Sequence, residues 1–191
     1  MVAKSLEQRI AEAVAEKIAM VPYNPSWLEL FRQEAEFLQI RFPSPLIRRI
    51  EHFGSTAVPG ITAKPIVDML VEISSAEEAG REIVPVLEAL GYDYFWRPEL
   101  DKSPMYHWFI KRESNGERTH HIHMVEADSN LWDRLYFRDY LKEFPREAAA
   151  YGALKERLAL EHPHDRSAYT HAKTGFIVAV TQKALEYFGI I

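Results

Sequence analysis

The 191-residue chain contains no cysteine. A disulfide framework and thiolate metal sites are therefore excluded, and any metal would need oxygen or imidazole ligands. Positive charge is also scarce. The chain has 23 Lys and Arg against 28 Asp and Glu, which gives a formal net charge of −5. No global positive field would attract bulk nucleic acid, so a charged substrate has to be bound by a local basic patch.

Long apolar runs are missing as well. The opening segment MVAKSLEQRIAEAVAEKIAM is interrupted by charges every few residues, so we expect neither a signal peptide nor a membrane span. The sequence favours a cytoplasmic protein with no membrane partner. Leu6, Ile10, Val14 and Ile18 repeat at helical spacing and predict an amphipathic helical extension over residues 1–20. That helix would lie on the domain or bind a partner.

Hydrophobic residues make up 47% of the chain, enough for the core of one domain over residues 21–191. Ser26 with Glu29, and Ser75 with Glu78, predict capping boxes that begin helices ending near Gln39 and Gly91. Strands are predicted at residues 46–53, 65–73, 92–96, 105–113 and 118–126, and further helices at 131–144, 146–161 and 169–188. This order predicts an α+β fold, with a mixed β-sheet and flanking helices over about 21–127 and a C-terminal helical lobe over about 128–191.

The segment EHFGSTAVPGITAKPIVDMLVEI contains the first candidate site. Gly54 would let the backbone approach a ligand closely, while Ser55 and Thr56 present hydroxyls and amides to phosphate oxygens. Asp68, on the following strand, would hold a divalent metal that bridges the phosphate, with Lys64 as a countercharge.

A plainer interpretation makes the same segment a surface turn followed by a buried strand. In that case Asp68 is hydrogen-bonded inside the sheet. An ionisable acid between Val67 and Met69 is costly unless something pairs with it, which favours the functional interpretation.

Histidines in THHIHMVE are the second candidate. His121 and His123 alternate along a strand, so they share one face about 7 Å apart at the backbone. Together with Asp68 they would suit Mn, Fe, Ni or Zn better than Mg. One imidazole could instead act as a general base, or both histidines could be satisfied within the sheet. A separation above about 8 Å between the Asp68 and His123 side chains would exclude a shared ion.

Basic residues of the predicted helical lobe are the third candidate. Arg134 and Arg138 are four residues apart and could form a fork for phosphates. Alternatively, Arg138 pairs with Asp139 as an ion pair. Lys173 and, more weakly, Lys155 are candidates for phosphate contacts, although surface lysines are common on helices.

The segments YNPSW, HFGSTAVPGITAKPIVD and FRDYL, in this order, resemble the GrpB family of bacterial proteins from about Val21 to the C-terminus. That family resembles the DNA polymerase β-like nucleotidyltransferase superfamily, whose hallmark is a Gly-Ser loop followed by a strand with two acids two residues apart. The resemblance implies a nucleotidyltransferase-like fold in which basic residues of the second lobe, here Lys173, reach a triphosphate. Family members fused to dephospho-coenzyme A kinase add a pantetheine-type or adenine ligand to the alternatives.

The chain departs from the superfamily pattern at Leu70, which occupies the position of the second acid. Glu72 lies roughly 13 Å from Asp68 along a strand, too far to share an ion. Two-metal transfer would therefore need ligands from elsewhere, and His121 and His123 are the candidates.

These patterns predict a metal-dependent nucleotidyltransferase-like enzyme that moves a nucleotidyl group from a nucleoside triphosphate to an acceptor. Its cofactor would be Mg or Mn, with Ni and Zn as alternatives. The alternatives are a catalytically reduced protein that binds a nucleotide or phosphorylated small molecule, and an interaction module. The expected catalytic and metal-binding residues are Asp68, His121 and His123, and the expected nucleotide-binding residues are Gly54, Ser55, Thr56, Lys64, Arg138 and Lys173.

Overall fold

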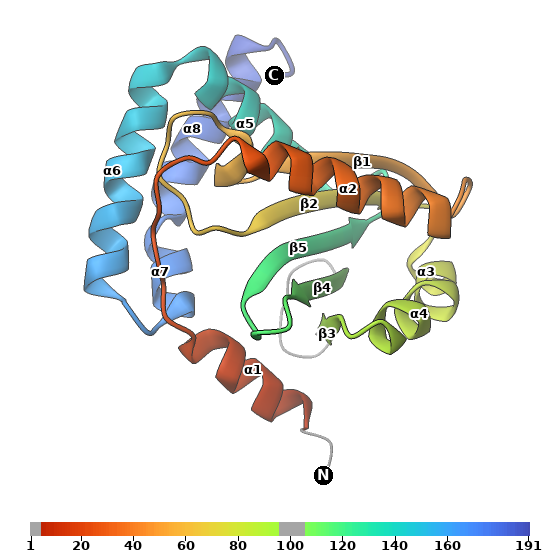
Figure 1. The fold of residues 1–191 in the computed structure, drawn as a ribbon. Coiled ribbons are helices and arrows are strands. Elements are labelled where there is room, and N and C mark those ends of the chain that lie inside the picture. Colours follow the sequence, from red (N-terminus) through yellow and green to blue (C-terminus); the bar gives the residue numbers. More distant parts are fainter. Residues whose placement is uncertain (1–4, 96–105) are drawn as a thin grey trace.

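A five-stranded mixed sheet lies at the centre of the protein (Figure 1). The computed structural model describes residues 5–95 and 106–191. The strand order is β1-β2-β5-β4-β3, in which β2 and β5 run parallel and the other neighbours antiparallel. The strands are β1 (Ile47–Phe53), β2 (Val67–Ile73), β3 (Asp93–Phe95), β4 (His107–Arg112) and β5 (Arg118–Val125). The prediction of a mixed sheet with flanking helices is confirmed.

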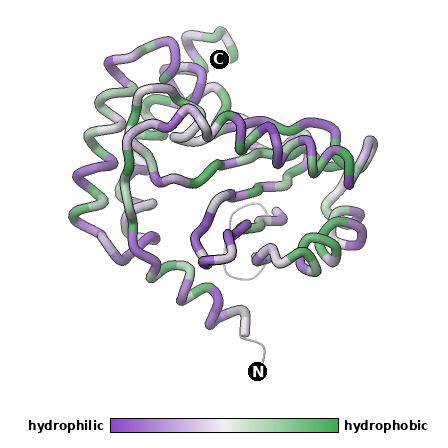
Figure 2. Tube along the Cα trace, in the orientation of Figure 1, coloured by the Kyte–Doolittle hydropathy of each residue, from purple (hydrophilic) through white to green (hydrophobic). Residues whose placement is uncertain are grey.

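The two faces of β2 pack against different layers, which explains why its sequence lacks a clean alternation of polar and apolar residues. One face contributes Val67, Met69 and Val71 to the largest hydrophobic cluster. That cluster also contains side chains of three helices, α2 (Ser26–Arg41), α3 (Ala76–Glu82) and α4 (Val84–Ala89). The opposite face presents Asp68 and Leu70 toward the helical lobe. Figure 2 shows the apolar stretches of the central strands and the alternating polar and apolar residues of α2.

The helical lobe consists of α5 (Asp133–Glu143), α6 (Pro145–Glu161), α7 (Arg166–Ala172) and α8 (Thr174–Tyr187). Pro145 begins α6, as a proline without an amide hydrogen can. The loop after β1 supplies Val58 and Ile61 to the core of this lobe. The Gly-Ser loop is therefore held between the sheet and the lobe. Among the described helices, none is long and apolar enough to cross a membrane.

Several predicted element boundaries were wrong. The first helix, α1, covers only Leu6–Ala15 of the predicted range 1–20, and the next residue, Glu16, is extended. Ile18 lies beyond it and is buried against Leu158 and Tyr169 of the lobe. The predicted helices 75–91 and 169–188 are each two helices, α3 with α4 and α7 with α8.

The predicted cap at Ser26 was also wrong, because Pro25 occupies the cap position and Ser26 is the first helical residue. The amide of Ser26 donates instead to the side chain of Asn24. Ser75 does cap α3 by accepting from the amide of Glu78. The predicted strand ends at Trp96 and Met105 lie outside the described residues.

Candidate metal and phosphate site

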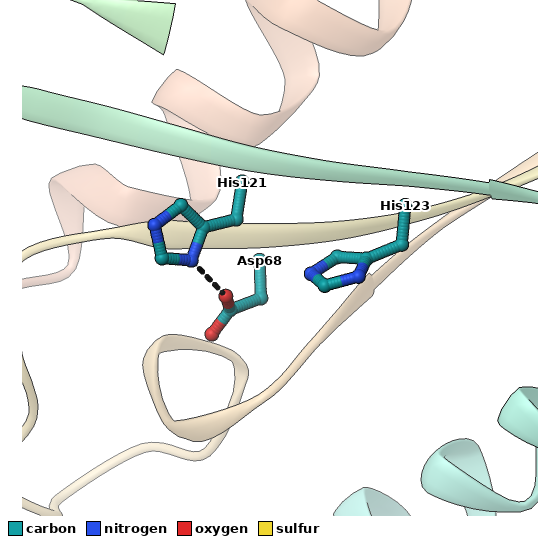
Figure 3. A group of neighbouring side chains, drawn as sticks. All are labelled: Asp68, His121 and His123. Atoms are coloured by element: carbon teal, nitrogen blue, oxygen red, sulfur yellow. Dashed lines mark hydrogen bonds and ion pairs between the residues drawn. The ribbon is translucent and has the colours of Figure 1, made fainter. Parts of the chain in front are cut away.

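Asp68, His121 and His123 come together on the face of the sheet that lies toward the helical lobe (Figure 3). The parallel register places Asp68 opposite His121 and Leu70 opposite His123. One potential ligand atom from each of the three residues lies within 4.8 Å of the others. Two donors on one ion at about 2.1 Å each lie at most about 4.2 Å apart. Closing the site would therefore take small side-chain rotations and a His121 tautomer without a proton on the ligating nitrogen.

The Asp68 carboxylate and the His121 imidazole form a hydrogen-bonded pair. His121 Nδ1 lies 3.1 Å from Asp68 Oδ1. Burial lowers the pKa of His121 to about 4, against the opposing effect of the Asp68 hydrogen bond. Burial alone would raise the pKa of Asp68, but the bond to His121 helps to hold it below its ordinary value. At neutral pH the pair is therefore a carboxylate that accepts a hydrogen bond from a neutral imidazole.

Solvent reaches this carboxylate, since 27% of the Asp68 side chain is exposed. His123 lies beside it, with one ring nitrogen directed toward Asp68 (Figure 3). Burial lowers the pKa of His123 to about 3, so its imidazole is also neutral. Its ring stacks on Trp108 with centroids 5.9 Å apart.

His123 Nδ1 is buried and has no hydrogen-bond partner within residues 5–95 and 106–191. An unpartnered buried polar atom is uncommon and calls for a ligand or another explanation. Because no bond fixes its tautomer, the ring can present an unprotonated nitrogen to an ion. One carboxylate with two neutral imidazoles fits a divalent transition metal.

Gly54 is the residue of the Gly-Ser loop that contacts this cluster. Its φ of 72° lies in the left-handed region, and a Cβ at this position would lie 2.3 Å from Asp68 Oδ2. The backbone can therefore pass the carboxylate only if residue 54 has no side chain. Within the protein, the group that this backbone approaches is the Asp68 carboxylate. The predicted approach of Gly54 to a phosphate stays a prediction.

The two hydroxyls of the loop have different surroundings. Thr56 is 2% exposed, and its hydroxyl donates to the carbonyl of Ile66 and contacts His52 Nε2 at 3.0 Å. The expectation that this hydroxyl contacts a phosphate is corrected, since it is used inside the loop. Ser55 is partly exposed, so its hydroxyl is open to a ligand.

Three lysines of the loop and the lobe lie within reach of the charge of Asp68. Burial lowers the pKa of Lys64 to about 7, of Lys155 to about 7 and of Lys173 to about 8. In each case the charge of Asp68 opposes that change. The ammonium groups of Lys64 and Lys173 lie 5.5 and 4.3 Å from the centre of the Tyr169 ring. Lys155 is 1% exposed and donates to the carbonyl of Thr62.

Comparison with known proteins identifies the family. A model of the GrpB protein family matches residues 17–183. The chain belongs to the GrpB family. It is 37% identical to a UPF0157 protein of Pseudomonas aeruginosa, over 93% of this chain and 72% of that protein. It is 33% identical to the glutamate-rich protein GrpB of Alkalihalophilus pseudofirmus, over 84% of this chain and 92% of that protein.

Some GrpB family relatives are longer than this chain. The chain spans 47% of the UPF0157 protein YqkA of Bacillus subtilis, to which it is 36% identical. Among solved structures, the conserved protein GrpB from Enterococcus faecalis matches with a TM-score of 0.77 and 33% identity. That match covers 89% of this chain and 99% of the other. The Enterococcus faecalis GrpB protein therefore shares this α+β fold.

Arg138 does not join the lysines around Asp68 in this GrpB family protein. Its guanidinium donates to Asp139, to Glu51 and to the carbonyl of His52. Its side chain is 12% exposed. The alternative interpretation, a packing ion pair with Asp139, describes Arg138. The predicted phosphate fork with Arg134 stays a prediction.

Two residues near the site had little or no signal in the sequence. Lys155 resembles an ordinary helical lysine in the sequence, but it is buried and donates to the carbonyl of Thr62 in the loop. Arg118 begins β5, and its Nη1 lies 3.4 Å from His121 Nε2. Their positions depend on contacts between distant parts of the chain, which local spacing does not encode.

Proposed function

We propose that the protein is a metal-dependent nucleotidyltransferase with a variant of the nucleotidyltransferase-like fold. It would transfer a nucleotidyl group from a nucleoside triphosphate to an acceptor. The observation that carries this proposal is the position of the Asp68, His121 and His123 group beside three desolvated lysines. Ligands for a cation and countercharges for an anion lie together, as a metal–triphosphate complex requires.

Each group has a role in this proposal. Asp68, His121 and His123 would hold the metal, which when bound supplies Lewis-acid polarisation of the reacting phosphate. Lys64, Lys155 and Lys173 would neutralise the phosphates. The oxygen of an acceptor hydroxyl would form a bond to the α-phosphorus while the bond from that phosphorus to the bridging oxygen breaks. Pyrophosphate would leave with the bonding electron pair, and the hydroxyl proton would pass to solvent water.

The chemistry of the three ligands also supports a prediction about the metal. Mg²⁺ prefers oxygen ligands and keeps several waters, whereas imidazole suits Ni and Zn. With two neutral imidazoles and one carboxylate, we expect Mn²⁺ or Zn²⁺ to bind more tightly than Mg²⁺.

A second candidate function is nucleotide or phosphometabolite binding without turnover. The environment of Leu70 favours it. This side chain is 0% exposed and packs in one cluster with Val125 of β5 and Leu135 of α5. The position of the second acid is therefore occupied by an apolar side chain in the hydrophobic core. It offers no ligand for a second metal ion.

We predict that Leu70→Asp destabilises the protein and restores no second metal site. A carboxylate in this apolar cluster would lose hydration without a partner, and we expect a loss of about 4 kcal/mol in the free energy of unfolding. Urea unfolding followed by circular dichroism measures it. Leu70→Met, which conserves volume, should cost less than about 1.5 kcal/mol. A stable Leu70→Asp protein that binds a second equivalent of Mn²⁺ would contradict this account.

The lysines predict a pH dependence for anion binding without metal. Because their pKa values are lowered to about 7, 7 and 8, their positive charge is present below pH 7 and lost as the pH rises to 9. We expect the affinity for tripolyphosphate to fall by at least about tenfold between pH 7 and pH 9.

Calorimetry at several pH values in a chelating buffer measures this affinity. Lys155→Met should weaken the binding and flatten its pH profile. The matched control is Lys183→Met, because Lys183 is exposed and paired with Glu147 far from this cluster. If the affinity of the unsubstituted protein for tripolyphosphate does not change with pH, the three lysines do not bind the phosphates.

Titration of the purified protein with each nucleoside triphosphate tests the function directly. Mg²⁺, Mn²⁺, Ni²⁺ and Zn²⁺ are supplied in turn, and both binding and pyrophosphate release are followed. Metal-dependent release supports the enzyme. Binding that is independent of the metal and without release, in the presence of candidate acceptors, would support the second candidate instead. Absence of any nucleotide binding would contradict both.

A further inference from the structure

The segment that follows α1 joins the sheet to the helical lobe through one carboxylate. Glu16 pairs with Arg112 of β4 at 2.7 Å, with Arg118 of β5 at 2.6 Å and with Arg166 of α7 at 3.7 Å. The backbone of the same segment accepts further bonds. Arg118 donates to the carbonyl of Ala13, and Arg166 donates to the carbonyl of Glu16.

Arg118 brings a positive charge next to the candidate metal ligands. Its side chain is 4% exposed, and its Nη1 lies 3.4 Å from His121 Nε2. A guanidinium so placed repels a divalent cation, and little water screens the repulsion. A metal can bind beside Arg118 only if another group compensates this charge.

Glu16 supplies that compensation. Among the described residues it is the acid in direct contact with Arg118, and the bond to Ala13 also holds the guanidinium against the N-terminal segment. The GrpB family model begins at residue 17. Glu16 therefore lies just outside the matched part of the chain.

We propose that Glu16 is a positioning residue whose carboxylate neutralises and holds Arg118, so that a divalent cation can bind at Asp68, His121 and His123. This inference rests on the metal site of the proposed function. Glu16 contacts neither the metal nor the nucleotide in this proposal. It acts through Arg118, so its effect depends on that residue being charged.

The test measures Mn²⁺ affinity of the full chain by calorimetry, without nucleotide. We expect Glu16→Gln to bind Mn²⁺ at least about tenfold more weakly than the unsubstituted protein, because Arg118 becomes an uncompensated cation. The double variant with Arg118→Gln should recover to within about threefold, because the repelling charge is gone. Glu7→Gln is the matched control: it removes the same charge from an exposed position of α1 and should leave the affinity unchanged.

A purely structural role would give another pattern. If Glu16→Gln binds Mn²⁺ as the unsubstituted protein does, or if the double variant binds as weakly as the single one, the inference is wrong. Arg118→Gln alone covers the case in which Glu16→Gln does not fold, and it should bind Mn²⁺ at least as tightly as the unsubstituted protein. Weaker binding by a folded Arg118→Gln protein would overturn the inference. Absence of Mn²⁺ binding by the unsubstituted chain would instead refute the proposed metal site, and this inference with it.

Discussion

Asp68→Asn should abolish metal binding while leaving anion binding intact. The amide oxygen can still accept the hydrogen bond from His121 Nδ1, so the fold is preserved, but the anionic ligand of the cluster is gone. We expect metal-dependent pyrophosphate release to fall by at least about a thousandfold. Calorimetry with Mn²⁺ and an enzymatic pyrophosphate assay measure the two effects.

The same substitution removes a negative charge from among three lysines. Tripolyphosphate should therefore bind the Asp68→Asn protein without metal at least as tightly as it binds the unsubstituted protein. Glu72→Gln is the control, since Glu72 lies on the same strand but pairs in register with Arg49. It should change neither binding nor release. If Asp68→Asn retains metal-dependent release, Asp68 is not the metal ligand.

Gly54→Ala should damage both stability and the site. The new Cβ would lie 2.3 Å from Asp68 Oδ2, and the alanine would have to adopt a φ of 72°. With a φ of 72° and a ψ of −169°, the backbone lies in a region that essentially only glycine adopts, and this conformation alone costs a side-chain-bearing residue about 1–3 kcal/mol. Displacing the carboxylate adds to this, and we expect a total loss of about 3 kcal/mol in the free energy of unfolding with weaker Mn²⁺ binding.

Gly60→Ala separates the two causes. Gly60 has a similar φ of 82°, but no described atom lies within 4 Å of a Cβ built there. It should lose only about 1 kcal/mol and keep its metal affinity. Equal losses of stability and metal affinity in the two variants would show that the contact between Gly54 and Asp68 has no special role.

Local patterns predicted much of the architecture. The alternation in HIH places His121 and His123 on one face of β5, and the polar residue in β2 identifies Asp68. Sequence alone did not show that β2 and β5 are parallel neighbours. That pairing brings Asp68 next to His121. It depends on the order of strands in the sheet, which the local pattern of residues does not encode.

The errors arise where several partners compete for one side chain. Arg138 could satisfy a phosphate or an acid, and the proximity of Glu51 on β1 is visible only in the fold. The sequence predicts Thr56 as a loop residue whose hydroxyl is available to a phosphate. In the fold this residue is buried and its hydroxyl donates to the carbonyl of Ile66. The cap predicted at Ser26 failed because the helix begins one residue earlier than expected, with Pro25 at the cap position and Ser26 as the first helical residue.

Anomalous diffraction from crystals soaked in Mn²⁺ tests the central claim most directly. We predict one strong peak at about 2.2 Å from a carboxylate oxygen of Asp68 and from one nitrogen each of His121 and His123. The side chains should have moved together to make these contacts. A structure in which Mn²⁺ binds only at surface carboxylates, with the Asp68 to His121 hydrogen bond unchanged, would contradict the account.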